Sequence, residues 1–150
     1  MPVDLSQFAG KTYKIMNLTG RMLLTAVPDG DRVFLLNDSR GEDQLWQLVD
    51  AGSGRCSIRC VLNGKVLEVA DASTFNMAPV IQGDFSRASH ELWTLEKGRD
   101  DMDDVDTYQI ISVNSGKCLD ISPIRIFPPL VAQMEGNQSP SQRWILQPVE

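Results

Sequence analysis

The stretches Gln44-Leu45-Trp46, Glu91-Leu92-Trp93 and Gln142-Arg143-Trp144 decide the fold of this chain. They contain all three tryptophans, and the steps between those tryptophans are 47 and 51 residues. Self-similarity at a period of roughly 20–50 residues is typical of repeated architectures. The sequence therefore predicts three similar units of about fifty residues each.

Other landmarks recur in the same order in every unit. A valine lies thirteen residues before each tryptophan, and a glycine followed by a basic residue and an apolar run lies further upstream. The valines are Val33, Val80 and Val131, and the glycines are Gly20, Gly64 and Gly116. Repeated landmarks in a fixed order indicate three diverged copies of one module.

Each unit contains four short runs rich in β-branched and apolar residues, separated by turns rich in Gly, Pro, Asn and Asp. The predicted strands are 12–17, 22–27, 32–37 and 44–49, then 56–61, 65–70, 79–83 and 91–96, then 107–113, 117–121, 130–135 and 142–147. No segment shows sustained helical apolar spacing. Twelve strands closed about a pseudo-threefold axis would bury every apolar face, and that all-β architecture is the β-trefoil.

The length of 150 residues fits one domain with one core, so we expect a single β-trefoil domain over 1–150. Its repeats are predicted at approximately 11–50, 54–97 and 105–149. The repeated valines and tryptophans are expected to point into this shared core.

Net charge and segment composition limit the classes of partner. The formal net charge is −6 and there is no basic patch, so we expect no nucleic-acid partner. No apolar stretch approaches the length of a membrane span, so no membrane insertion is expected. The amino-terminal residues lack a basic region followed by an apolar one, and the three cysteines are expected to be reduced; both features predict a cytoplasmic protein, released if at all by a non-classical route.

The landmarks resemble the ricin B-type lectin family, the carbohydrate-binding modules with Q-x-W repeats. The residues that carry the resemblance are the three tripeptides and the stretch Asn114-Ser115-Gly116-Lys117-Cys118-Leu119-Asp120-Ile121. The similarity extends from about residue 11 to 149, and signal-less members of this kind resemble small fungal lectins.

The resemblance implies one shallow sugar site per unit. In the family, an aspartate after the Cys-Leu pair accepts hydrogen bonds from sugar hydroxyls, an aromatic residue after the valine stacks on the ring, and a polar residue near Q-x-W completes the contacts. A carboxylate paired with an amide suits the hydroxyls of a neutral sugar. The sequence places no pair of carboxylates for acid–base work on a glycosidic bond, so we expect a binding protein without catalytic residues, metal or cofactor.

The third unit matches this pattern best. Asp120 takes the aspartate position and is expected to face water on the rim, Gln142 is the glutamine of Q-x-W, and Asn137 or Gln138 supplies a further polar contact. Met134 stands where the family has its aromatic platform.

The other two units depart further from the family. In the second, Glu68 replaces the aspartate, His90 takes the polar position, Glu91 replaces the glutamine, and Phe85 is expected to compensate for Gly83 at the platform. In the first, Leu24 replaces the aspartate, so no ordinary site is expected. The units therefore rank third, second, first.

Several of these residues also have expected structural roles. The tryptophans are expected to pack in the core, and Gln44 and Gln142 to hold turn backbone through their amides. An aspartate after a strand often fastens a turn, so both roles stay open for Asp120. His90 is equally a surface residue, a sugar contact or a partner of Glu91.

Two further stretches allow other functions. The aspartate-rich segment 97–106 lacks the ligand spacing of a calcium-binding EF-hand loop and is interpreted as a solvated connector. The loop 122–129 carries apolar residues between prolines, and it either forms a contact surface, such as a homodimer face, or packs back on the barrel. The leading hypothesis is a lectin for galactose or N-acetylgalactosamine; the alternative is a β-trefoil inhibitor of cysteine or serine proteases that acts through such loops.

Overall fold

The computed structural model describes residues 3–98 and 105–149, and within them it contains twelve strands. The strands of the first repeat are β1 (Thr12–Asn17), β2 (Leu23–Ala26), β3 (Val33–Leu36) and β4 (Trp46–Gly52). Those of the second are β5 (Arg55–Cys60), β6 (Val66–Val69), β7 (Val80–Gly83) and β8 (Trp93–Lys97). Those of the third are β9 (Tyr108–Ser112), β10 (Cys118–Ile121), β11 (Val131–Met134) and β12 (Trp144–Val149). Every predicted strand overlaps one of these.

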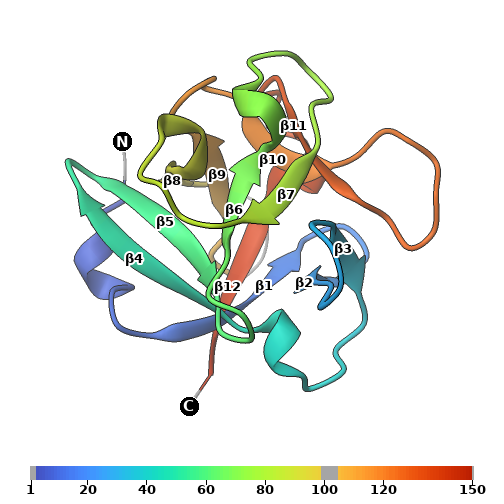
Figure 1. The fold of residues 1–150 in the computed structure, drawn as a ribbon, viewed down its shortest axis with the longest axis horizontal. Helices are drawn as coiled ribbons and strands as arrows, with labels where there is room; N and C mark the ends of the chain where they lie inside the picture. The colour runs from blue at the N-terminus through green and yellow to red at the C-terminus, as the bar shows by residue number, and fades with distance from the viewer. Residues whose placement is uncertain (1–2, 99–104, 150) are drawn as a thin grey trace.

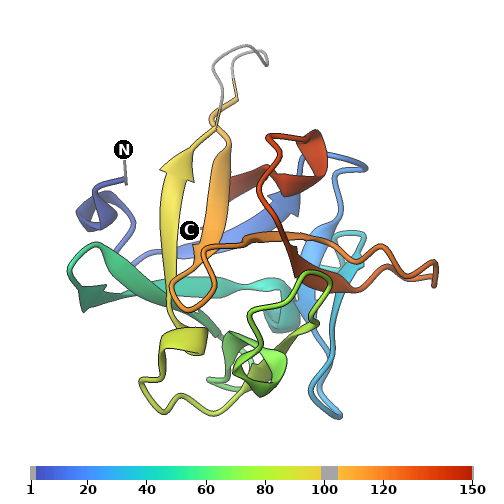
Figure 2. The ribbon, with the colours of Figure 1, turned by 90° about the horizontal axis from the view of Figure 1, so that it is seen from above.

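Six strands close into a barrel. β1 pairs with β12 and β4, β5 pairs with β4 and β8, and β9 pairs with β8 and β12, all antiparallel. Closure leaves no free edge in this ring, which satisfies its backbone hydrogen bonds. Figure 1 shows the barrel, and Figure 2 shows it turned by 90° about the horizontal axis.

The other six strands form three hairpins, β2–β3, β6–β7 and β10–β11, that meet one another at one end of the barrel. Isolated bridges join Arg32 to Ile81, Phe34 to Leu130 and Pro79 to Ala132, so each hairpin touches both others. The β-trefoil prediction is confirmed.

The repeated landmarks fill the core. Trp46, Trp93 and Trp144 are completely buried, and each indole Nε1 donates to the backbone oxygen of a leucine 3.0–3.1 Å away. The three valines are at most 2% exposed. A buried indole needs a partner for its N–H, and each of the three has one. The predicted core positions of the three tryptophans and the three valines are confirmed.

Short 3-10 turns precede three of the barrel strands, where strands had been predicted to begin. They are η2 (Glu42–Gln44), η4 (Ser89–Glu91) and η5 (Pro140–Gln142), which follow η1 (Leu5–Gln7) and η3 (Ala70–Ala72) in the element order. The first residue of each Q-x-W tripeptide therefore ends a turn, and the tryptophan begins the strand.

The aspartate-rich segment 97–106 is described only at its ends, because residues 99–104 lie outside the described residues. At these ends Lys97 and Asp106 form an exposed ion pair at 3.4 Å. The described residues include no helix with the length and apolar character needed to cross a membrane.

Candidate functional site

The corresponding site in each repeat is fixed by its tryptophan. Trp93 donates to the oxygen of Leu67 and Trp144 to that of Leu119, so the next residues, Glu68 and Asp120, are equivalent. Trp46 donates to the oxygen of Leu24, which makes Thr25 the equivalent residue in the first repeat.

The assignment of Leu24 to the aspartate position is therefore wrong. Thr25 lies five residues after its glycine, whereas Glu68 and Asp120 lie four residues after theirs, so the first repeat has one extra residue in this turn. That turn includes Arg21 in the left-handed region with φ 58° beside Gly20 with φ 78°. Counting from the glycine consequently misplaced the site by one residue.

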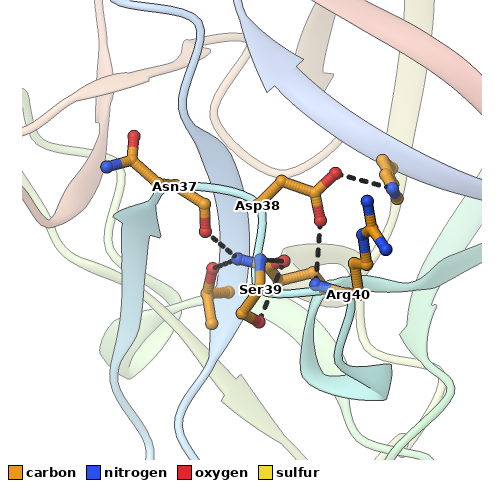
Figure 3. A network of polar contacts seen from close by, with 7 residues as sticks. Asn37, Asp38, Ser39 and Arg40 are labelled. Carbon is orange, nitrogen blue, oxygen red and sulfur yellow. Dashed lines mark hydrogen bonds and ion pairs between the residues drawn. The ribbon is translucent and has the colours of Figure 1, made fainter.

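The glutamine of the first repeat shows what this position does structurally. Gln44 Oε1 accepts from the backbone N–H of Ser39 at 2.9 Å, and its Nε2 donates to the oxygen of Asn37 at 2.8 Å and to Thr25 Oγ1 at 3.1 Å. In the same loop Asp38 accepts from Lys14 Nζ at 2.7 Å and from the N–H of Arg40 (Figure 3). Thr25 is 1% exposed and donates to Leu23, so this repeat presents no free polar group at the aspartate position.

The third repeat uses the same construction with a carboxylate. Gln142 is completely buried; its Oε1 accepts from the N–H of Asn137 at 2.9 Å and its Nε2 donates to the oxygen of Glu135 at 2.9 Å. The amide of Gln142 also donates to Asp120 Oδ2 at 3.1 Å. The predicted role of Gln44 and Gln142 in holding turn backbone is confirmed.

The expectation that Asp120 faces water is wrong. This side chain is 7% exposed, and its Oδ1 accepts from the N–H of Ile121 at 2.7 Å. A carboxylate has about four acceptor directions, and these two hydrogen bonds occupy two of them. Asp120 therefore fastens its own turn and keeps acceptor capacity beyond these two bonds.

The other predicted residues of the third site lie around this carboxylate. Met134 is half-buried and pairs across the hairpin with Cys118, which puts it on the same face as Asp120. Asn137 and Gln138 are exposed in the loop that Gln142 holds, and Gln138 has a left-handed φ of 63°. The structure thus places Met134 on the strand face of Asp120, and it places Asn137 and Gln138 in the loop that Gln142 ties to this carboxylate.

The second repeat lacks a donor where the other repeats have one. Glu91 is 2% exposed; its Oε1 accepts from the N–H of Ser86 at 2.7 Å and its Oε2 from the Ser86 hydroxyl at 2.8 Å. Burial acts to raise the pKa of Glu91, but the hydrogen bonds from Ser86 and Ala88 outweigh it, so its pKa lies below the ordinary value.

Glu68 occupies the space that a platform side chain would need. A Cβ at Gly83 would lie 2.9 Å from Glu68 Cδ, so only glycine fits there with this carboxylate in place. Burial raises the pKa of Glu68, and the negative charges of Glu91, Asp31 and Asp84 raise it further, while His90 opposes the shift. Burial is the largest cause of this direction, and the nearby carboxylates add to it.

Glu68, His90 and Glu91 are also the side chains in the described part of the chain that could together hold a metal ion. One ligand atom from each lies within 4.8 Å of the others. Both oxygens of Glu91 already accept hydrogen bonds, which reduces what it can offer a cation.

Phe85, the remaining predicted site residue, lines a separate hollow. Its neighbours there include Arg59 of β5 and Arg87, and neither Glu68 nor His90 is among them. Arg59 and Arg87 were missed in the sequence, where nothing marks two arginines 28 residues apart in the second repeat as neighbours.

The protein-family model described as "Ricin-type beta-trefoil lectin domain-like" matches residues 5–83 and 42–125, which together span most of the chain. The chain belongs to this family. Comparison with curated protein sequences gives no match.

Solved structures agree with the lectin-type fold. A designed threefold-symmetric protein, ThreeFoil, is 29% identical with a TM-score of 0.82, over 92% of this chain and 99% of that one. The exo-beta-1,3-galactanase 1,3Gal43A from Clostridium thermocellum is 25% identical with a TM-score of 0.82, and the match spans 93% of this chain but 30% of the enzyme. The Macrolepiota procera ricin B-like lectin, solved in complex with lactose, shares the fold at 16% identity with a TM-score of 0.76, over 98% of this chain and 99% of that one.

Proposed function

We propose that this protein is a carbohydrate-binding lectin without enzymatic activity, and that it binds galactose or N-acetylgalactosamine at the third repeat. The observation that carries the proposal is the Asp120–Gln142 pair. Its buried amide orients a carboxylate that retains acceptor capacity at the rim. The lactose complex of the Macrolepiota procera lectin supports a galactoside as ligand.

Each residue of the third repeat has a distinct role in this proposal. Asp120 accepts from two sugar hydroxyls, Asn137 and Gln138 add contacts from the loop, and Met134 lies under the apolar face of the ring. Gln142 is completely buried, so it acts by orienting Asp120 and touches no ligand. With a thioether in place of an aromatic platform, we expect a Kd in about the millimolar to high-micromolar range.

The test is a glycan array with the parent protein, followed by titration of lactose into site variants. Asp120→Asn keeps the shape of the side chain and removes its charge, so we expect loss of galactoside binding. Asn137→Ala removes an exposed side chain whose Oδ1 accepts from the N–H of Ser139 at 2.9 Å; it should weaken binding and lower the unfolding midpoint only slightly. An Asp120→Asn protein that is folded by NMR and binds lactose like the parent would overturn the proposal.

Avidity at such weak sites needs a second site or a dimer. We propose that Glu68 and His90 form a weaker second site and that the protein works in the cytoplasm as a homodimer. Light scattering across a concentration series tests the dimer, and Glu68→Gln tests the second site on multivalent glycans.

A second function is favoured by one observation, the loop 122–129. Phe127 is 87% exposed, Ile124 55% and Ile126 43%. The loop that carries them is the orange one at the right-hand edge of Figure 1. We propose protease inhibition through this loop as the alternative function. Inhibition assays with papain and trypsin, repeated with Phe127→Ala, distinguish it from the lectin function.

A further inference from the structure

A cavity of about 520 Å³ lies between two repeats, away from the sugar positions of the family. One wall is the outward face of the β4–β5 hairpin, with Val49, Ser57 and Arg59. The other wall comes from the loop before β8, with Phe85, Arg87 and Leu92. Leu48 and Ile58 on the opposite face of the hairpin are in the core, so this cavity is separate from the barrel interior.

Two polar groups in this cavity are buried without a partner. Ser57 is 1% exposed, and its hydroxyl makes no hydrogen bond within the described residues. The Nε of Arg59 is likewise buried and unpaired there. Burying a donor without an acceptor costs about 1–3 kcal/mol, so such groups call for an explanation, and a ligand is one.

The cavity also gathers positive charge. Arg59 and Arg87 both line it, and no ion pair of either is found in residues 3–98 and 105–149. One carboxylate, Asp50, lies at the lining, and its Oδ1 already accepts from the N–H of Gly52 at 2.8 Å. Two cations therefore face one anion in a protein whose overall charge is −6.

The loop wall is held in place by Glu91, which stands where the other two repeats have a glutamine. Glu91 accepts from the N–H and the hydroxyl of Ser86, the residue between Phe85 and Arg87. Arg87 itself has a left-handed φ of 66°. This anchoring fixes the backbone from which Phe85 and Arg87 reach the cavity.

We propose that this cavity binds an acidic sugar, whose carboxylate pairs with Arg59 and Arg87 and accepts from Ser57. Guanidinium groups bind carboxylates and sulfates by charge-assisted hydrogen bonds. Phe85 offers an aromatic face for the ring of the same sugar. The inference rests on the lectin function only in taking the ligand to be a sugar, and its site is distinct from Asp120.

The experiment titrates the full chain with D-galacturonate and with D-galactose, which differ at C6, and follows backbone amide shifts by NMR. Galacturonate should shift the amides of residues 57–59 and 85–87 and bind there at least about tenfold more tightly than galactose. Sodium sulfate and galactose 6-sulfate are further arms, which separate a free oxyanion from an acidic sugar.

Three variants make the test specific. Arg59→Gln and the exposed Arg87→Gln should each weaken galacturonate binding about tenfold or more, whereas Arg55→Gln, on the same hairpin but outside the cavity, should not. Ser57→Ala should weaken binding while leaving the unfolding midpoint unchanged or raised, because the unpaired hydroxyl costs stability.

Failure of this inference is distinguishable from failure of the lectin function. Equal binding of galacturonate and galactose at this cavity, sulfate binding as tight as that of galacturonate, or unchanged binding by both arginine variants would overturn it. Galactose shifts around Asp120 and residues 135–138 report separately on the third repeat.

Discussion

The amide of Gln142 donates to the carboxylate of Asp120 at 3.1 Å, and this contact repeats at 3.1 Å between Gln44 and Thr25 in the first repeat. The second repeat places Glu91 and Glu68 at these positions, so two acceptors replace a donor and an acceptor. The difference predicts how stability changes when the glutamine is replaced by glutamate in the third repeat and the glutamate by glutamine in the second.

Gln142→Glu should destabilise the protein by about 2–4 kcal/mol at pH 7, because it buries a second carboxylate against Asp120 and removes the donor. Urea unfolding followed by tryptophan fluorescence measures the change. The reciprocal variant Glu91→Gln restores a donor toward Glu68 and should change stability by less than about 1 kcal/mol. Equal losses in the two variants would contradict this account.

Glu68→Gln should stabilise the protein at pH 7. The pKa of Glu68 is raised in the folded state, so its ionised form disfavours folding above that pKa. The gain should disappear as the pH falls through the raised pKa toward 4.5, since the parent side chain is then protonated as well. Because the carboxylate is half-buried and screened, we expect less than about 1 kcal/mol.

Glu91 should show the opposite pH dependence. Its pKa is lowered, so its contribution to stability is present above about 4.5 and is lost as the pH falls through the folded value. Glu135→Gln, which changes an exposed side chain in the third repeat, is the matched control for both. Urea midpoints from pH 3 to pH 7 test the signs, and a Glu68→Gln gain that persists at pH 3 would refute the explanation.

The barrel could be predicted from the sequence because its determinants repeat. Each tryptophan and its valine mark the same core position three times, and burial of large apolar side chains is a strong, local signal. The 3-10 turns were missed, since the side chains that build them, such as Gln44, act through hydrogen bonds to a loop that the pattern does not show.

The site was predicted less completely, for physical reasons. One extra turn residue moved the first-repeat position from Leu24 to Thr25, and only the indole hydrogen bond of Trp46 reveals the register. The burial of Asp120 depends on Gln142, which is 22 residues away. Arg59 and Arg87 line one cavity because the loop before β8 lies beside β5 in the folded chain, and no spacing rule could predict this.

Gln133→Ala should cost about 2–4 kcal/mol. This side chain is completely buried; it donates to the oxygens of Ser73 and Phe75 at 3.0 and 2.8 Å and accepts from Ser115 Oγ at 2.7 Å. Its removal takes the Nε2 donor away from these two part-buried carbonyl groups and leaves a cavity where the side chain was. Hydrogen exchange should show faster exchange in residues 73–78, whose backbone this glutamine holds against β11.

Gln82→Ala is the matched comparison for that variant. Gln82 holds the oxygens of Val27 and Arg32 at 2.8 and 3.1 Å in the corresponding turn of the first repeat. We expect a similar loss of stability, with faster hydrogen exchange in residues 27–32 and unchanged exchange in residues 73–78. Identical exchange patterns in the two variants would contradict a local role for each glutamine.

The three cysteines should be unreactive in the native protein. All three are free and buried, and burial raises the pKa of Cys56 to about 12 and that of Cys118 to about 11. The pKa of Cys60 is also raised, mainly by burial. Because the thiolate is the nucleophile, its population at pH 8 is too small for reaction with an aromatic disulfide reagent. The reagent should label three thiols per chain in 8 M urea and essentially none without it, and native labelling at a rate independent of added urea would show that a thiol is accessible without unfolding.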